Sequence, residues 1–133
     1  MENENPSILS HVSIGTNDLS RSVAFYDAVL STLGCKKIAE HLEFGAVAYG
    51  KRFPELWVQR PLDGQPATVG NGTHFCIIAS SKEAVQAFHE AALAAGATDE
   101  GPPGPRPHYS PGYYGAFVRD PDGHKIEAAF IES

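Results

Sequence analysis

The chain has 133 residues, of which 42% are hydrophobic and 20% charged, and its formal net charge is −6. These values suit one globular domain with its own core. An acidic chain whose Lys/Arg runs never exceed two residues disfavours nucleic acid and anionic membranes as partners. No apolar run approaches the roughly 18 residues that a membrane span needs.

The first seven residues and the cysteines bear on location. Residues 1–7 are polar and acidic, unlike a signal peptide, so we expect a flexible N-terminal segment and a cytoplasmic protein. Cys35 and Cys76 are the only cysteines, and they lie too far apart in sequence to suggest a zinc ribbon or a redox pair.

The first half of the chain predicts a strand, a helix and three short strands. Residues 8–14 alternate between apolar and polar, as a half-buried strand does. Asp18 or Ser20 can cap a helix over 19–33, and Gly34 can end it. Further strands are predicted at 35–40, 44–50 and 55–59.

The second half repeats this order. Residues 73–79 predict a strand, Ser80 or Ser81 a helix cap, and 82–95 a helix that ends at Gly96. Two strands, 114–119 and 124–131, close the chain.

A proline-rich segment, 101–113, lies before these closing strands. Its prolines exclude a helix and disfavour a central strand. We expect either a plain surface loop or a stiff flap over a pocket, which would carry Arg106, His108, Tyr109 and Tyr113.

The two halves align, with His11–Ile14 opposite His74–Ile77. We therefore predict an α+β fold of two βαβββ modules, 8–60 and 73–131, joined by a linker over 61–72. Together the modules would form one domain over 8–131, a cupped mixed sheet with helices on its outer face.

Three ionisable residues fall on the strand face opposite the helix-packing side: His11, His74 and Glu127. Any one of them alone is most simply a structural or solvated residue. Two imidazoles and a carboxylate at repeat-related strands indicate a metal site with open coordination positions.

Several motifs carry a resemblance to a known family. They are His11-Val12-Ser13-Ile14 with the helix motif from Asp18, Gly72-Thr73-His74, and Asp120-Pro121-Asp122-Gly123. The chain resembles the vicinal oxygen chelate superfamily, also called the glyoxalase/bleomycin resistance/extradiol dioxygenase family. The resemblance implies one divalent metal ion (Zn, Ni, Co, Fe or Mn) held by His11, His74 and Glu127.

The place of a fourth ligand falls on Trp57, where similar lactoylglutathione lyases carry a carboxylate. Three ligands without a fourth resemble the facial triad of Fe(II) dioxygenases. A register slip of two residues would instead bring Glu55 or Gln59 to this place.

The activity that the resemblance implies is lyase or isomerase chemistry on a small molecule that chelates the metal through neighbouring oxygens. The catalytic residue that moves the proton would be Glu127, with His108 or Tyr114 as alternative proton carriers. The substrate-binding residues would be Trp57, Gln59, Cys76, Tyr109 and Tyr113.

Two alternatives stay open: an Fe(II) extradiol-type dioxygenase, and a metal-free protein that binds an antibiotic or aromatic molecule. The family also implies a homodimer, sometimes with exchanged modules, in which His11 and His74 can come from different subunits.

Overall fold

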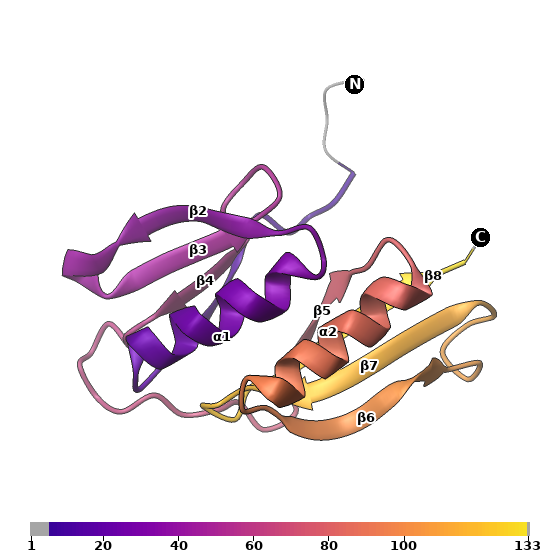
Figure 1. Cartoon of the computed structure of the whole chain (residues 1–133). Coiled ribbons are helices and arrows are strands. Elements are labelled where there is room, and N and C mark those ends of the chain that lie inside the picture. The colour runs from indigo at the N-terminus through magenta and orange to yellow at the C-terminus, as the bar shows by residue number, and fades with distance from the viewer. Residues whose placement is uncertain (1–5, 133) are drawn as a thin grey trace.

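The computed structural model describes residues 6–132, so most of the N-terminal segment predicted to be flexible lies outside the described residues. The chain folds into two βαβββ modules that lie side by side (Figure 1). Module one contains β1 (Val12–Gly15), α1 (Leu19–Ser31), β2 (Lys36–His41), the short 3-10 helix η1 (Leu42–Phe44), β3 (Ala46–Gly50) and β4 (Leu56–Gln59). Module two contains β5 (His74–Ile78), α2 (Lys82–Ala94), β6 (Thr98–Pro105), β7 (Tyr113–Arg119) and β8 (Lys125–Ile131).

Each module contributes one four-stranded sheet of the same topology. The strand orders are β1-β4-β3-β2 and β5-β8-β7-β6, in which the first and last strands of each module pair in parallel. The remaining pairs are antiparallel. The predicted α+β architecture of two repeated modules is therefore confirmed.

Both helices begin at side-chain caps that the sequence indicated. Asp18 accepts a hydrogen bond from the Arg21 N–H at the start of α1, and Ser81 accepts one from the Ala84 N–H at the start of α2. Gly34, at φ +79°, provides the left-handed turn after α1. Within residues 6–132, neither helix has the length and apolar character needed to cross a membrane.

The proline-rich segment departs from its prediction. Residues 101–105 belong to β6, so the expectation of a loop is wrong there. This strand lies at the edge of its sheet and pairs with β7 through two register shifts. Pro102, Pro103 and Pro105 are tolerated because an edge strand can leave donors unpaired. Residues 106–112 form the turns that connect β6 to β7.

One apolar core joins the two modules. The helices α1 and α2 lie next to each other and cover one face of both sheets (Figure 1). Alternate strand residues point into this core, and Val58, Val118, Ile126 and Ala128 are almost fully buried. Burial of each large apolar side chain contributes about 1.5–3 kcal/mol. Among the described residues no α-helix packs on the opposite face of either sheet, and we call it the helix-free face.

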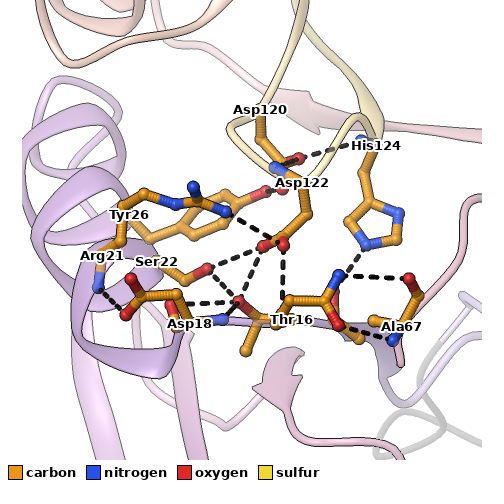
Figure 2. A network of polar contacts seen from close by, with 11 residues as sticks. Thr16, Asp18, Arg21, Ser22, Tyr26, Ala67, Asp120, Asp122 and His124 are labelled. Carbon is orange, nitrogen blue, oxygen red and sulfur yellow. Dashed lines mark hydrogen bonds and ion pairs between the residues drawn. The ribbon is translucent and has the colours of Figure 1, made fainter. Parts of the chain in front are cut away.

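A polar cluster fastens module two to the start of α1, and we call it the module clasp (Figure 2). The Asp122 carboxylate accepts hydrogen bonds from Thr16 Oγ1 at 2.7 Å, Ser22 Oγ at 3.0 Å and the Asn17 N–H at 3.0 Å. Arg21 Nη2 lies 3.2 Å from Asp122 Oδ1, and the Asp122 side chain is 2% exposed. Asp122 therefore joins groups that are about a hundred residues away in sequence.

The rest of the clasp comes from the same turn between β7 and β8. The Tyr26 hydroxyl donates to Asp120 Oδ2 at 2.5 Å, and His124 Nε2 lies 2.7 Å from the Gly15 carbonyl oxygen (Figure 2). Asp120 also accepts the His124 N–H, which shapes the turn. Burial, and then the Asp120 carboxylate, raises the pKa of Tyr26 well above its usual value, so this phenol remains a donor.

Candidate functional site

A histidine and a buried carboxylate meet on the helix-free face of module two. His74 Nε2 lies 3.1 Å from Glu127 Oε1. The Glu127 side chain is 2% exposed, whereas that of His74 is 43% exposed. In the parallel register of β5 and β8, Cys76 lies opposite Glu127 and His74 lies opposite Lys125, two residues before Glu127. His74 is therefore a diagonal neighbour of Glu127, and the strand pairing itself brings the imidazole to the carboxylate.

Tyr113 partners the second oxygen of this carboxylate. Its hydroxyl donates to Glu127 Oε2 at 2.5 Å. Gly115 makes room for this contact, because a Cβ there would lie 3.1 Å from Glu127 Oε2 and 3.2 Å from Tyr113 Cε1. Partial burial, and then the hydrogen bond to Glu127, raises the pKa of Tyr113, so the phenol stays protonated and keeps donating.

Cys76 lies beside this pair as a neutral thiol. Partial desolvation, and then the Glu127 carboxylate, raises its pKa to about 12. A thiol with such a pKa is a weak nucleophile at neutral pH. Cys76 can therefore contact a ligand on this face without reacting with it.

The first histidine of the predicted triad lies on module one. His11 is exposed immediately before β1, and its Nδ1 lies 3.1 Å from Ser10 Oγ. With Glu55, Trp57 and neighbouring residues it lines a hollow of about 680 Å³. Trp57 stacks on His41, with ring centroids 5.9 Å apart and ring planes at 12°. Gln59 is half-buried at the end of β4 on the same helix-free face.

The structure brings together two of the three predicted metal ligands within one chain. His74 and Glu127 are adjacent, but among residues 6–132 no group of three His, Cys, Asp or Glu side chains is arranged to hold a metal ion. The sequence left open whether His11 joins this pair within one chain or from a second subunit, and within residues 6–132 of one chain the three do not form a metal-holding group. The imidazole and carboxylate donors that do meet suit a borderline divalent cation.

The turns after β6 carry aromatic side chains toward Glu127. The His108 and Tyr109 rings have centroids 4.4 Å apart, and Tyr109 lies edge-on to Tyr113 at 5.1 Å. Tyr109 is 54% exposed. The flap residues predicted to bind substrate thus continue outward from the Tyr113–Glu127 hydrogen bond.

Tyr114 lies on the other face of the sheet. Its hydroxyl accepts a hydrogen bond from Gln86 Nε2 of α2 at 2.9 Å, and Lys82 Nζ lies 5.6 Å from the centre of its ring. The structure therefore does not bring Tyr114 to Glu127, although the sequence predicted a catalytic role for it.

Two aromatic neighbours of the site were not among the predicted site residues. Phe117 pairs with Glu127 across β7 and β8, and its ring centre lies 5.9 Å from that of His74. His41 covers Trp57. Alternation along β7 from Tyr113 places Phe117 on the same face, so periodicity alone contained this signal.

Comparison with known proteins identifies the family to which the chain belongs. A family model described as the Glyoxalase/Bleomycin resistance protein/Dioxygenase superfamily matches residues 8–128. The chain belongs to this superfamily. Its members typically bind a divalent metal ion and small molecules, and they are often dimeric.

Solved structures of the superfamily share the fold. A glyoxalase/bleomycin resistance protein from Albidiferax ferrireducens T118 is 42% identical, with a TM-score of 0.83 over 93% of this chain and 98% of that one. A glyoxalase-related enzyme from Fulvimarina pelagi is 22% identical, with a TM-score of 0.71 over 95% and 88% of the two chains. A lactoylglutathione lyase from Agrobacterium tumefaciens is 22% identical, with a TM-score of 0.63 over 96% of each chain. Curated proteins give no match.

Proposed function

We propose that this chain is a cytoplasmic, divalent-metal-dependent enzyme of the glyoxalase type. Its substrate would be a small molecule that chelates the metal through two neighbouring oxygens, and its reaction a lyase or isomerase step. The observation that carries this proposal is the buried Glu127 carboxylate, held between His74 and Tyr113 on a helix-free face. A buried carboxylate is costly unless it is paired, and such sites are commonly functional.

His74 and Glu127 would hold the metal ion from module two. A bound divalent ion acts as a Lewis acid and stabilises negative charge that develops on substrate oxygens. Tyr113 fixes Glu127 Oε2 by its hydrogen bond, which leaves Oε1 directed toward His74. His108, exposed on the neighbouring turn beside Tyr109, would carry a proton at the edge of the site.

We propose that the third ligand, His11, comes from a second copy of the chain. His11 is exposed and remains apart from His74 and Glu127 within one chain. Large apolar side chains lie exposed near both half-sites, with Ile8 97%, Phe53 64% and Ile78 79% exposed. A homodimer that covers these side chains would bring each His11 to the other subunit's His74–Glu127 pair.

Metal analysis tests the enzyme proposal. Protein purified without chelator is analysed for transition metals and then titrated with Zn, Ni, Co, Fe(II) and Mn. We expect one ion per chain, and loss of it in His11→Ala, His74→Ala and Glu127→Gln. His108→Ala is the matched control, because it removes an exposed histidine that lies outside the proposed ligand set. If less than about a tenth of an equivalent is present and none is taken up, the proposal fails in favour of a metal-free binding protein.

Mixed dimers test whether the site is shared. His11→Ala and Glu127→Gln chains are unfolded together, refolded and titrated with metal. If the site is shared, a heterodimer has one site that carries both substitutions and a second site that carries neither. Random pairing makes about half of the dimers heterodimers, so about a quarter of all sites should again bind metal. A site within one chain would restore none.

An Fe(II) extradiol dioxygenase is the second candidate function. It is favoured by Trp57, which occupies the place of a fourth ligand and stacks on His41. A set of two histidines and one carboxylate leaves open positions for dioxygen and a catechol. Oxygen uptake by the Fe(II)-loaded protein with catechol would identify this activity, and its absence would exclude catechol cleavage.

A further inference from the structure

Two cationic side chains converge on one aromatic ring beside the candidate site. Arg106 Cζ lies 5.6 Å, and Lys125 Nζ 5.2 Å, from the centre of the Phe117 ring. The His74 ring lies 5.9 Å from the same ring, and Phe117 pairs with Glu127 across the strands. The two cations therefore adjoin the proposed metal ligands.

Neither cation is neutralised by a carboxylate. Among residues 6–132, the ion pairs formed by Lys and Arg side chains involve Arg21, Lys37, Lys82 and Arg119 but neither Arg106 nor Lys125. Other cations without an acidic partner, such as Lys36 and Arg52, are exposed, whereas Arg106 and Lys125 are half-buried. Partial burial of an unpaired charge is unfavourable, and a bound anion would relieve that cost.

The Arg106 guanidinium is held in place before any ligand arrives. Its Nη1 donates to the Gly104 carbonyl at 2.9 Å and its Nη2 to the Pro102 carbonyl at 2.7 Å. A Cβ at Gly101 would lie 3.3 Å from Nη2, and one at Gly104 would lie 3.2 Å from Nη1. The two glycines of β6 thus leave the space that this side chain occupies. Fixing it in advance lowers the entropy cost of binding an anion.

We propose that Arg106 and Lys125 bind an anionic group of the substrate, a carboxylate, phosphate or phosphonate. This inference rests on the proposed function and narrows its substrate class to acids. Arg106, Lys125 and His74 all lie beside the Phe117 ring, so a compact molecule seated against this ring would direct its anion to these cations and its chelating oxygens toward Glu127. A neutral substrate would leave the two half-buried cations without an acidic partner.

The test uses phenylphosphonate and, as its neutral counterpart, dimethyl phenylphosphonate. Binding to the full-length protein is measured by NMR titration at low and at moderate salt. We expect phenylphosphonate to bind, the dimethyl ester not to bind, and salt to weaken the interaction. Lys125→Gln should weaken binding by about tenfold, because a charge-assisted hydrogen bond is lost. Lys125→Arg should retain it.

The matched control is Lys36→Gln, which removes the same charge from an exposed position of module one and should bind phenylphosphonate like the unchanged protein. Arg106→Gln should also weaken binding, and its thermal melt is measured because Arg106 additionally holds its own turn. The inference is overturned if Lys125→Gln binds normally, if the ester binds equally well, or if the unchanged protein binds nothing up to about 10 mM.

Metal uptake is measured on the same samples. If metal binds but phenylphosphonate binding does not depend on Lys125, only the anion site is refuted. If phenylphosphonate binding depends on Lys125 but no metal binds, the anion site stands and the metal-dependent enzyme is refuted.

Discussion

Replacing Asp122 by alanine should release the module clasp. The substitution removes the acceptor for the Thr16 and Ser22 hydroxyls and the Asn17 N–H, and it leaves Arg21 without its partner. A hydrogen bond to a charged group contributes about 1.5–3 kcal/mol, so three independent bonds would sum to more than 4 kcal/mol.

Two features of the clasp reduce this sum. Thr16 and Ser22 remain hydrogen-bonded to each other at 2.6 Å, so their hydroxyls keep a partner. The Arg21 side chain is 48% exposed, and a pair with such an exposed cation contributes less than about 1 kcal/mol. We therefore expect Asp122→Ala to lower the free energy of unfolding by about 3 kcal/mol, with a fall in Tm of roughly 10 °C.

Urea unfolding measures this loss. The fluorescence of Trp57, the only tryptophan, follows module one, and far-UV circular dichroism follows both modules. Asp63→Ala is the control, because the Asp63 side chain accepts the exposed Gln65 N–H within its own linker and has no other hydrogen bond to residues 6–132. A loss below about 1 kcal/mol for Asp122→Ala would refute the conclusion that the clasp fastens the modules.

Acid should reproduce part of this effect. Burial by itself would raise the pKa of Asp122, but the hydrogen bonds from Thr16, the Asn17 N–H and Ser22, together with Arg21, outweigh burial and lower it. A pKa lowered by folding contributes stability above the unfolded value, and that contribution is lost as the pH falls through the folded value. The stability difference between the unchanged protein and Asp122→Asn should therefore narrow as the pH falls below about 4. A constant difference would contradict the assigned shift.

Two substitutions and one labelling experiment probe the site further. Tyr113→Phe removes the donor to Glu127 Oε2, and calorimetry should show metal affinity lowered by about 10- to 100-fold; an unchanged Kd would separate Tyr113 from the metal site. Gly115→Ala places a methyl group 3.1 Å from Glu127 Oε2, and it should lower the free energy of unfolding by about 1–3 kcal/mol in a denaturant titration; an unaltered midpoint would contradict the proposed crowding. With a pKa of about 12, Cys76 should react with iodoacetamide at pH 8 roughly 50-fold more slowly in the native than in the urea-unfolded chain. Equal rates by mass spectrometry would refute this.

The elements encoded by local contacts were predictable from the sequence. The Asp18 and Ser81 caps lie three residues before the N–H groups that they accept, and both helices were placed by apolar spacing. Alternation and the duplication also placed His74 and Glu127 on one face, because a repeated topology pairs the first and last strands of each module.

Features that depend on distant contacts were not predictable. β6 is a strand despite its prolines because β7 offers it a free edge, which is a property of the sheet. Whether His11 can join His74 and Glu127 depends on how the two modules are arranged, and that arrangement rests on contacts distant in sequence, such as the clasp and the packing of α1 against α2. Tyr113 contacts Glu127 in the space that Gly115 leaves free of a side chain. The alternation of apolar and polar residues along β7 does not predict this contact.

The outer edge strands of the two sheets determine whether copies of this chain can pair strand to strand into longer assemblies. Pro102, Pro103 and Pro105 remove backbone donors from β6, while β2 carries Lys36, Lys37 and Glu40 and a register shift. Such edges resist pairing with further strands. The opposite edges, β1 and β5, have no proline and pair on one side only. If copies of the chain joined through β1 and β5, the assembly would end on the β2 and β6 edges, and open-ended strand polymerisation would be disfavoured.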